Sequence, residues 1–298
     1  MKKWVLRIIG YGTLAALFLA VVGACVIWRY VGVPDDTRIT RNIPYVTGGG
    51  ERQSLDLYTN ADPNAPLVIW IHGGGWRAGS KSDCPVGMLI RRGFSVASIN
   101  YRFTQTDLFP AQIQDCKSAV RYLRAHSKEL GINATVIGVA GASAGGHLVS
   151  LLGLTGNITT FDVGENLDQS SAVQAVVNIV GPTDLSRFDK YPNQDVIFML
   201  NDLLGGTVSQ KPAEAKAGSP ITYIATAARA GAPPFLNLYG GKDDLVPAEQ
   251  GEIFDKALRE AGIATTLKIY PDAGHELPIL SAGSLTLDFL EQQLLHRK

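Results

Sequence analysis

The residue whose setting points most directly to chemistry is Ser143, at the centre of Gly-Ala-Ser-Ala-Gly at 141–145. An apolar run, 136–140, precedes this pentapeptide, and a helical pattern, 144–154, follows it. Gly-x-Ser-x-Gly between a strand and a helix predicts a nucleophile elbow, a strained turn that holds the serine hydroxyl above a sheet. Side chains at the two flanking glycines would collide with the neighbouring strand and helix. We therefore expect Ser143 to be a covalent nucleophile.

A nucleophilic serine needs a base, and the base needs an acid that orients it. Asp243 follows an apolar run at 235–239, and His275 follows the last of the apolar runs. The order Ser143, Asp243, His275 is that of the α/β-hydrolase triad. We expect the histidine to take the serine proton and the aspartate to fix the histidine tautomer. Asp244 remains an alternative for the acid.

A glycine-rich segment upstream supplies candidate donors for a developing oxyanion. His-Gly-Gly-Gly-Trp at 72–76 comes directly after an apolar run, and its glycines let backbone N–H groups approach a substrate oxygen closely. We predict an oxyanion hole formed by the N–H groups of Gly74, Gly75 and Ala144, the residue after the nucleophile. His72 is expected to brace this loop.

Two ring side chains are candidates for the wall of the substrate pocket. Trp76 ends the glycine segment, and His147 lies about one helical turn after Ser143. Core packing of Trp76 and a packed, hydrogen-bonded position for His147 within its helix are the alternatives. Asp115 is expected to pair locally with Arg102.

The elements that must position these residues alternate along the chain, which predicts an α/β fold with a mostly parallel sheet. Strands are predicted at 54–58, 67–71, 95–100, 136–140, 173–179, 235–239 and 265–270. Helices are predicted at 84–92, 110–129, 144–154, 248–262 and 279–296. The segment 185–222 follows neither period, so we expect short helices and loops there, over the sheet edge, where a lid could lie.

The chain resembles an α/β-hydrolase of the esterase and lipase group that carries His-Gly-Gly-Gly, which includes the relatives of hormone-sensitive lipase. More narrowly, it resembles the acetyl xylan and feruloyl esterase-like (BD-FAE) branch. The matching segments, from about residue 43 to the C-terminus, are 72–76, 98–102, 109–116, 141–148, 181–184, 243–247 and 274–275. The resemblance implies an α/β-hydrolase fold with an eight-stranded, mostly parallel sheet flanked by helices. It also implies Asp243 as the acid, since that acid begins Asp-x-x-Val-Pro. Tyr239 and Glu276 depart from residues common in the family.

The motifs and the resemblance together predict a serine carboxylic-ester hydrolase that acts on acetyl or other short-chain acyl esters through an acyl-enzyme intermediate. Small-molecule or carbohydrate-linked esters are the expected substrates. Water completes the turnover, so we expect no cofactor, and the sequence has no metal-ligand spacing. A serine peptidase or amidase of the same fold is one alternative, and a catalytically silent binding protein on a hydrolase scaffold is another.

Composition limits the size of the core, the kind of partner and the state of the cysteines. The 298 residues are 46% hydrophobic, enough for a large core, and 27 basic residues balance 27 acidic residues. No long block of like charge occurs, so composition gives no reason to expect a nucleic-acid partner. Cys116 lies on the apolar face of a helical stretch, which predicts a buried free thiol. A disulfide with Cys84 is the alternative in an oxidising compartment.

The N-terminus is predicted to be a membrane anchor at residues 1–30. Basic residues precede an uncharged run from Ile8 to Trp28, which as a helix would span roughly 30 Å, about one hydrocarbon core. Cleavage as a signal peptide and lipidation at Cys25 are the alternatives.

Residues 31–42 are polar and contain Pro34, so they are expected to form a linker to a catalytic domain at 43–298. A short basic head before an apolar run is typical of an export signal. We therefore expect the catalytic domain to lie outside the cytoplasm, on the periplasmic or secreted side.

Overall fold

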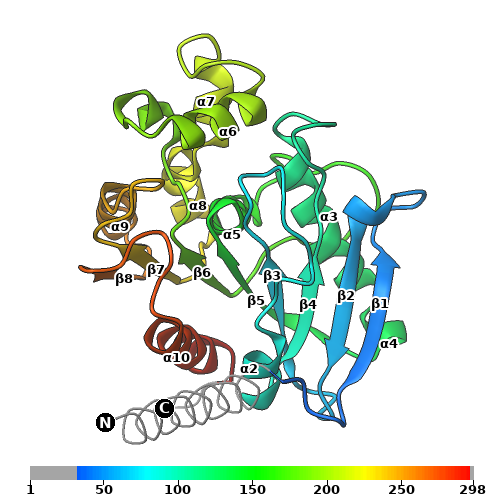
Figure 1. Ribbon diagram of the computed structural model, residues 1–298. Coiled ribbons are helices and arrows are strands. Elements are labelled where there is room, and N and C mark those ends of the chain that lie inside the picture. The colour runs from blue at the N-terminus through cyan, green and yellow to red at the C-terminus, as the bar shows by residue number, and fades with distance from the viewer. Residues whose placement is uncertain (1–31, 296–298) are drawn as a thin grey trace, which may run out of the picture.

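The central sheet of the computed structural model, which describes residues 32–295, has eight strands in the order β1-β2-β4-β3-β5-β6-β7-β8 (Figure 1). The strands are β1 (Arg38–Pro44), β2 (Ser54–Thr59), β3 (Pro66–Ile71), β4 (Ser95–Ile99), β5 (Asn133–Ala142), β6 (Ala175–Ile179), β7 (Phe235–Gly240) and β8 (Thr265–Tyr270). β2 pairs antiparallel with β1 and β4, and the other pairings are parallel. The predicted eight-stranded, mostly parallel sheet is confirmed.

The inner strands are apolar on both faces because helices cover both faces. Every residue of β3 is buried; Ile69 packs into the core on one face, and Trp70 packs into the core on the other. Side chains of β8, at the sheet edge, are half-buried or exposed. Parallel strands end at a common edge, so the loops after β3, β5, β7 and β8 converge there. This convergence gathers the predicted site residues.

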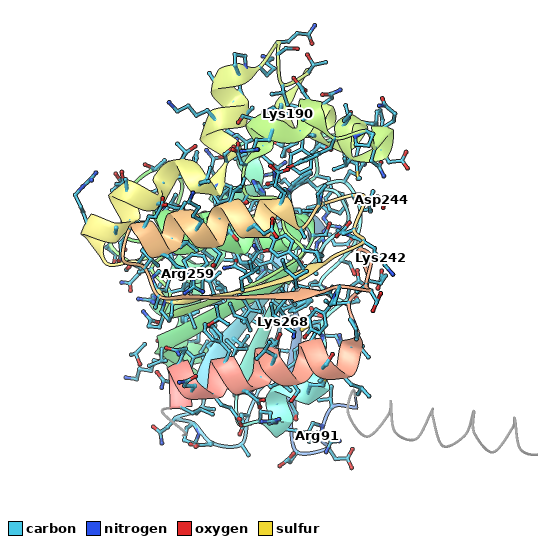
Figure 2. The ribbon with its side chains drawn as sticks, turned by 90° about the vertical axis from the view of Figure 1, so that its left-hand side faces the viewer. Arg91, Lys190, Lys242, Asp244, Arg259 and Lys268 are labelled. Atoms are coloured by element: carbon cyan, nitrogen blue, oxygen red, sulfur yellow. The ribbon has the colours of Figure 1, made fainter. Side chains whose placement is uncertain are left out.

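The first face of the sheet is covered by α3 (Ala111–Ala125), α5 (Ala144–Thr155), α8 (Ile224–Ala230) and α9 (Glu249–Glu260). The second face is covered by α2 (Val86–Arg91) and α10 (Ile279–Leu290). Figure 2 shows the sheet edge-on, with α9 above it and α10 below. Further helices are η1 (Glu51–Gln53), α4 (Ser127–Leu130), η2 (Leu185–Lys190), α6 (Gln194–Leu204), α7 (Pro212–Gly218), η3 (Pro220–Tyr223) and η4 (Glu291–Leu295).

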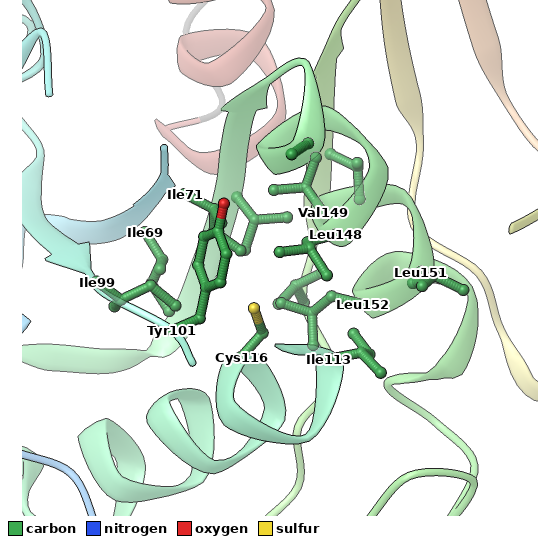
Figure 3. Packing of buried hydrophobic residues seen from close by; sticks show 14 of the residues in the cluster. Ile69, Ile71, Ile99, Tyr101, Ile113, Cys116, Leu148, Val149, Leu151 and Leu152 are labelled. Carbon is green, nitrogen blue, oxygen red and sulfur yellow. The ribbon is translucent and has the colours of Figure 1, made fainter. Parts of the chain in front are cut away.

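The two cysteines that the structure describes lie on opposite faces of the sheet. Cys116 of α3 is fully buried near Ile113 and Leu148 in the first core (Figure 3). Cys84 packs beside the second core. Both thiols are free. The predicted buried free thiol at Cys116 is confirmed, and the alternative disulfide does not form.

Two predicted boundaries are wrong. The predicted linker, 31–42, overlaps β1, which begins at Arg38 and pairs along β2, where Arg41 makes a 2.9 Å ion pair with Asp56. The polar composition of this edge strand hid its pairing, since most of its residues are exposed. The helix predicted at 110–129 divides at His126, which ends α3 and precedes α4.

The segment between β6 and β7 consists of short helices, η2, α6, α7, η3 and α8, joined by loops, as expected. It forms a cap next to the loops at the carboxyl ends of the strands (Figure 1). Among residues 32–295, no helix is long and apolar enough to cross a membrane. The predicted anchor at 1–30 lies outside the described residues.

Candidate active site

Ser143 occupies the strained turn between β5 and α5. Its backbone has φ 54° and ψ −118°, a conformation that residues with side chains rarely adopt. A Cβ at Gly141 would lie 2.6 Å from the carbonyl oxygen of Gly145, and one at Gly145 would overlap the carbonyl of Ile71. Close packing therefore explains both glycines. The Ser143 hydroxyl makes no hydrogen bond within residues 32–295, so it is free to react.

The base and the acid come from the loops after β8 and β7. Nδ1 of His275 lies 2.7 Å from Oδ2 of Asp243. The other carboxylate oxygen accepts the N–H groups of Leu245 and Val246, each at 2.9 Å, and the Asp243 side chain has no exposed surface. Asp244 is exposed. The histidine therefore donates Nδ1–H to Asp243, which leaves Nε2 as a proton acceptor.

The glycine loop after β3 lies directly beside the nucleophile. A Cβ at Gly73 would lie 3.4 Å from that of Ser143. Gly74 and Gly75 have φ of 105° and 58°, values that favour glycine. Within residues 32–295, the N–H groups of Gly74, Gly75 and Ala144 donate to no protein acceptor, the last because it starts α5. These donors remain available for a substrate oxygen.

His72 braces the glycine loop, as expected. Its Nδ1–H donates to the carbonyl of Gly73 at 2.7 Å, its Nε2 accepts from Arg52 at 3.2 Å, and its ring stacks on Tyr101. Burial lowers the pKa of His72 to about 4. The ring is therefore neutral at pH 7 and holds the loop without taking part in proton transfer.

The prediction that Trp76 and His147 line the substrate pocket is wrong. Both side chains are buried, and Nε1–H of Trp76 donates to Nδ1 of His147 at 3.2 Å. Nε2 of His147 lies 2.6 Å from the carbonyl of Gly218 and donates to it. Burial lowers the pKa of His147 to about 4. The two residues instead connect the glycine loop, α5 and the cap.

A cavity of about 810 Å³ opens beside Ser143 and His275. Gly73, Gly74 and Gly75 form part of its wall. From the triad it extends over the second face of the sheet, toward α2 and α10. The nucleophile, the base and two of the oxyanion donors, Gly74 and Gly75, thus share one cavity, which is the arrangement that acyl transfer requires.

Sequence reasoning missed several residues of this cavity wall. Met199 of α6 packs so closely on Gly75 that a Cβ there would overlap its sulfur. Leu277 and Leu287 line the cavity from the His275 loop and α10. No local motif marks them, because each becomes a wall residue only through contacts between elements distant in sequence. The apolar pattern of α10 was the one available signal.

Known proteins resemble this chain in sequence as well as in fold. The BD-FAE family model matches residues 55–258. The chain belongs to this family. Esterase LipQ of Mycobacterium tuberculosis is 33% identical over 245 residues, which cover 79% of this chain and 56% of LipQ. Esterase LipC of the same organism is 32% identical over 244 residues, which cover 79% of this chain and 60% of LipC. The BD-FAE chain thus spans little more than half the length of these relatives.

Solved structures of esterases share the fold of this BD-FAE chain. A truncated carbohydrate esterase from gut microbiota has a TM-score of 0.80 at 28% identity, over 89% of this chain and 99% of that one. The butyrate-bound esterase Est2 of Thermogutta terrifontis has a TM-score of 0.68 at 27% identity, over 88% of this chain and 94% of Est2.

Proposed function

We propose that this BD-FAE chain is a serine carboxylic-ester hydrolase. The observation that carries the proposal is the 2.7 Å contact between Asp243 and His275 in a cavity that also exposes the strained Ser143. The acid and the base are paired, and Ser143 and His275 line the same cavity. The family membership and the esterase relatives support the same chemistry.

The reaction follows from the positions of these groups. Nε2 of His275 accepts the hydroxyl proton of Ser143 as Oγ attacks the ester carbonyl. The carbonyl oxygen becomes an oxyanion, which accepts hydrogen bonds from the N–H groups of Gly74, Gly75 and Ala144. His275 then protonates the departing alcohol, and an acyl-enzyme remains. Water, deprotonated by the same histidine, releases the acid and restores the serine.

Acetyl or other short-chain acyl esters are the proposed substrates, carried by small molecules or by carbohydrates. One similar structure is named a carbohydrate esterase, and another holds butyrate. Met199 narrows the cavity beside the oxyanion donors, which favours a small group at that point. No step needs a cofactor.

In the direct test, the purified full-length chain is assayed against p-nitrophenyl esters from acetate to decanoate. The amide p-nitroacetanilide is assayed beside them. We expect release of p-nitrophenol with the highest kcat/KM at short acyl chains, and at least about 1,000-fold slower cleavage of the anilide. Cleavage of the anilide at a rate comparable to that of the esters would show that the chain is an amidase rather than an esterase. If the chain hydrolysed no ester, the alternative of a catalytically silent binding protein would hold instead.

We also propose that the chain is anchored through residues 1–30, with its catalytic domain outside the cytoplasm. The basic head and the apolar run of the sequence support this location. An alkaline phosphatase fusion after residue 40 should be active in intact bacterial cells, because that enzyme requires an oxidising compartment. An inactive but expressed fusion would place the domain in the cytoplasm.

A further inference from the structure

The cavity beside Ser143 is larger than a short acyl group requires. Its volume of about 810 Å³ lies within the range, about 300–1,000 Å³, of sites that bind drug-sized ligands. From the triad the cavity continues toward α2 and α10 as an apolar arm, whose lining residues include Trp70, Met88, Leu89, Leu277, Ile279 and Leu287. This arm has room for a second group of the substrate besides a small acyl group.

The arm offers few hydrogen-bonding groups to an occupant. Nε1 of Trp70 and Oγ1 of Thr286 are buried inside the protein, so neither atom can pair with a ligand in the cavity. Outside the triad, the other described lining residues with side-chain oxygen are the exposed Ser82, Asp83 and Glu276. A sugar hydroxyl in the arm would lose its hydrogen bonds to water without replacing them, which is costly. The arm therefore fits an apolar group.

The position of His275 assigns the arm to one side of the ester. In the proposed reaction His275 protonates the departing alcohol, so the alcohol oxygen must lie beside Nε2 of this residue. Leu277 and Ile279, two and four residues after His275, line the arm, so the group attached to that oxygen can enter it. The acyl group then lies toward Gly75, where Met199 packs so closely that a Cβ on the glycine would overlap its sulfur.

The strand register gives the length of the arm. Ala140 of β5 lines the cavity in register with Trp70, and Ser143 lies three residues farther along the chain. Three strand residues span about 10 Å, which an extended chain of roughly eight bonds covers. Counted from the ester carbonyl, an alcohol group of about six or seven carbons fits this length.

The wall of the arm includes a close contact between α2 and α10. Met88 of α2 and Gly283 of α10 both line the cavity, and a Cβ at Gly283 would lie 2.9 Å from Cε of Met88. Glycine within a helix lowers helix stability relative to residues with side chains. At this position it leaves room for Met88, and a larger side chain would take up space in the arm.

We propose that the apolar arm holds the alcohol group of the substrate, and that the preferred substrates are short-chain acyl esters of apolar alcohols. The inference rests on the proposed ester hydrolysis and specifies the alcohol that the ester carries. The lining of the arm selects an apolar group, the loop after His275 selects the alcohol side of the ester, and Met199 restricts the acyl side. A carbohydrate ester would leave the arm empty and gain nothing from it.

Isomeric esters test this assignment in the purified full-length chain. Hexyl acetate and ethyl hexanoate contain the same atoms and differ in which side of the ester carries the long chain. Burial of one CH₂ group is worth about fourfold in binding, and about twofold where half of the group stays exposed. Hexyl acetate has four more CH₂ groups than ethyl acetate, so we expect about 15-fold higher kcat/KM for it. Ethyl hexanoate should not exceed ethyl acetate. Titration of the released acid at constant pH measures all three rates.

Variants assign the preference to residues of the arm. Ile279→Ser should lower the ratio of hexyl acetate to ethyl acetate by about threefold, because the apolar wall is lost at that point. Leu280→Ser is the matched control, since Leu280 is 64% exposed and Ile279 is 69% exposed, but Leu280 does not line the cavity. Its ratio should equal that of the unmodified chain. Gly283→Leu should lower the ratio to about twofold or less by filling the arm. The ratio compares two substrates in one variant, so a general loss of activity cancels.

Three results would overturn the proposal in a chain that hydrolyses ethyl acetate. Ethyl hexanoate is cleaved as fast as hexyl acetate, hexyl acetate is cleaved no faster than ethyl acetate, or the preference survives unchanged in both Ile279→Ser and Gly283→Leu. The ethyl acetate reaction separates these failures from failure of the esterase itself, since a chain that hydrolyses no ester would remove both proposals.

Discussion

The histidines at the sheet edge and beneath it show how environment divides one side-chain type into two roles. His275 lies on a loop at the cavity, with a 2.7 Å contact from Nδ1 to Asp243, and its side chain is 22% exposed. His147 lies on α5 with no exposed surface, and both its ring nitrogens are paired with neutral groups, Trp76 and Gly218. The first histidine has a carboxylate that stabilises a transient positive charge, and the second has none.

A histidine close to the nucleophile in sequence need not be the catalytic one. His147 follows Ser143 by about one helical turn, closer in sequence than His275. A proton on Nδ1 of His147 would face the N–H of Trp76, donor against donor. The hydrogen bonds of His147 therefore hold the glycine loop and the cap in place. Substitution of His275 should therefore affect catalysis, and substitution of His147 should affect mainly stability.

The largest effect is expected at the base. His275→Ala should lower kcat for p-nitrophenyl acetate by about 10⁴-fold or more, because the serine loses its proton acceptor. The thermal unfolding midpoint should change little, since the side chain lies at the cavity rather than in a core. Steady-state kinetics and calorimetry measure the two quantities. Retained turnover would show that another residue is the base.

The acid is expected to matter almost as much. Asp243→Asn should reduce kcat by about 10⁴-fold, because an amide can neither fix the productive tautomer nor stabilise the imidazolium. Asp244→Asn is the matched control and should remain within about twofold of the unmodified chain. The reverse pattern would contradict the contact between Asp243 and His275.

Substitution of the buried histidine should have the opposite balance of effects. His147→Phe leaves the N–H of Trp76 and the carbonyl of Gly218 unpaired, so we expect a loss of about 2–4 kcal/mol in the free energy of unfolding. Activity should fall by about tenfold or less. Denaturant unfolding measures the loss, and His126→Ala, at the half-buried end of α3, should lose no more than about 1 kcal/mol. A loss of activity as complete as that of His275→Ala would place His147 in the chemistry.

The free energy of unfolding should fall at acid pH because His147 is neutral in the folded chain. The pKa of His147 is about 4 in the folded chain and 6.5 for a free side chain, so the unfolded chain binds more protons between these values. Its stabilising contribution is therefore fully present above pH 6.5 and is lost as the pH falls toward 4. The loss amounts to about 3 kcal/mol for this residue. The unfolding free energy of His147→Phe should depend less steeply on pH in this window, and an equal slope would mean that His147 is not held neutral.

The triad could be predicted from sequence because local motifs and sheet geometry both determine its place. Glycines around Ser143 mark the elbow, and loops after parallel strands must meet at one edge, which brings Asp243 and His275 together. The direction of Trp76 could not be predicted. Its backbone has φ 59°, an unusual value for a residue with a side chain, and the ring points into the core toward His147.

Other features depend on packing between distant segments, which the sequence does not display. β1 is a mostly polar strand that exists through its pairing with β2, so composition made its first residues resemble a linker. Met199 reaches Gly75 because the cap folds over the glycine loop. Trp70 of β3 and Thr286 of α10 line the same cavity although they are far apart in sequence.

The central claim is that Ser143 forms the acyl-enzyme, and covalent labelling tests it most directly. The full-length chain and Ser143→Ala would each be treated with a p-nitrophenyl alkylphosphonate, and the modified peptide would be located by mass spectrometry. We predict one phosphonyl group, on Ser143, with parallel loss of esterase activity, and neither label nor activity in Ser143→Ala. Ester hydrolysis that persists in Ser143→Ala, or inactivation through a label on another residue, would contradict the account.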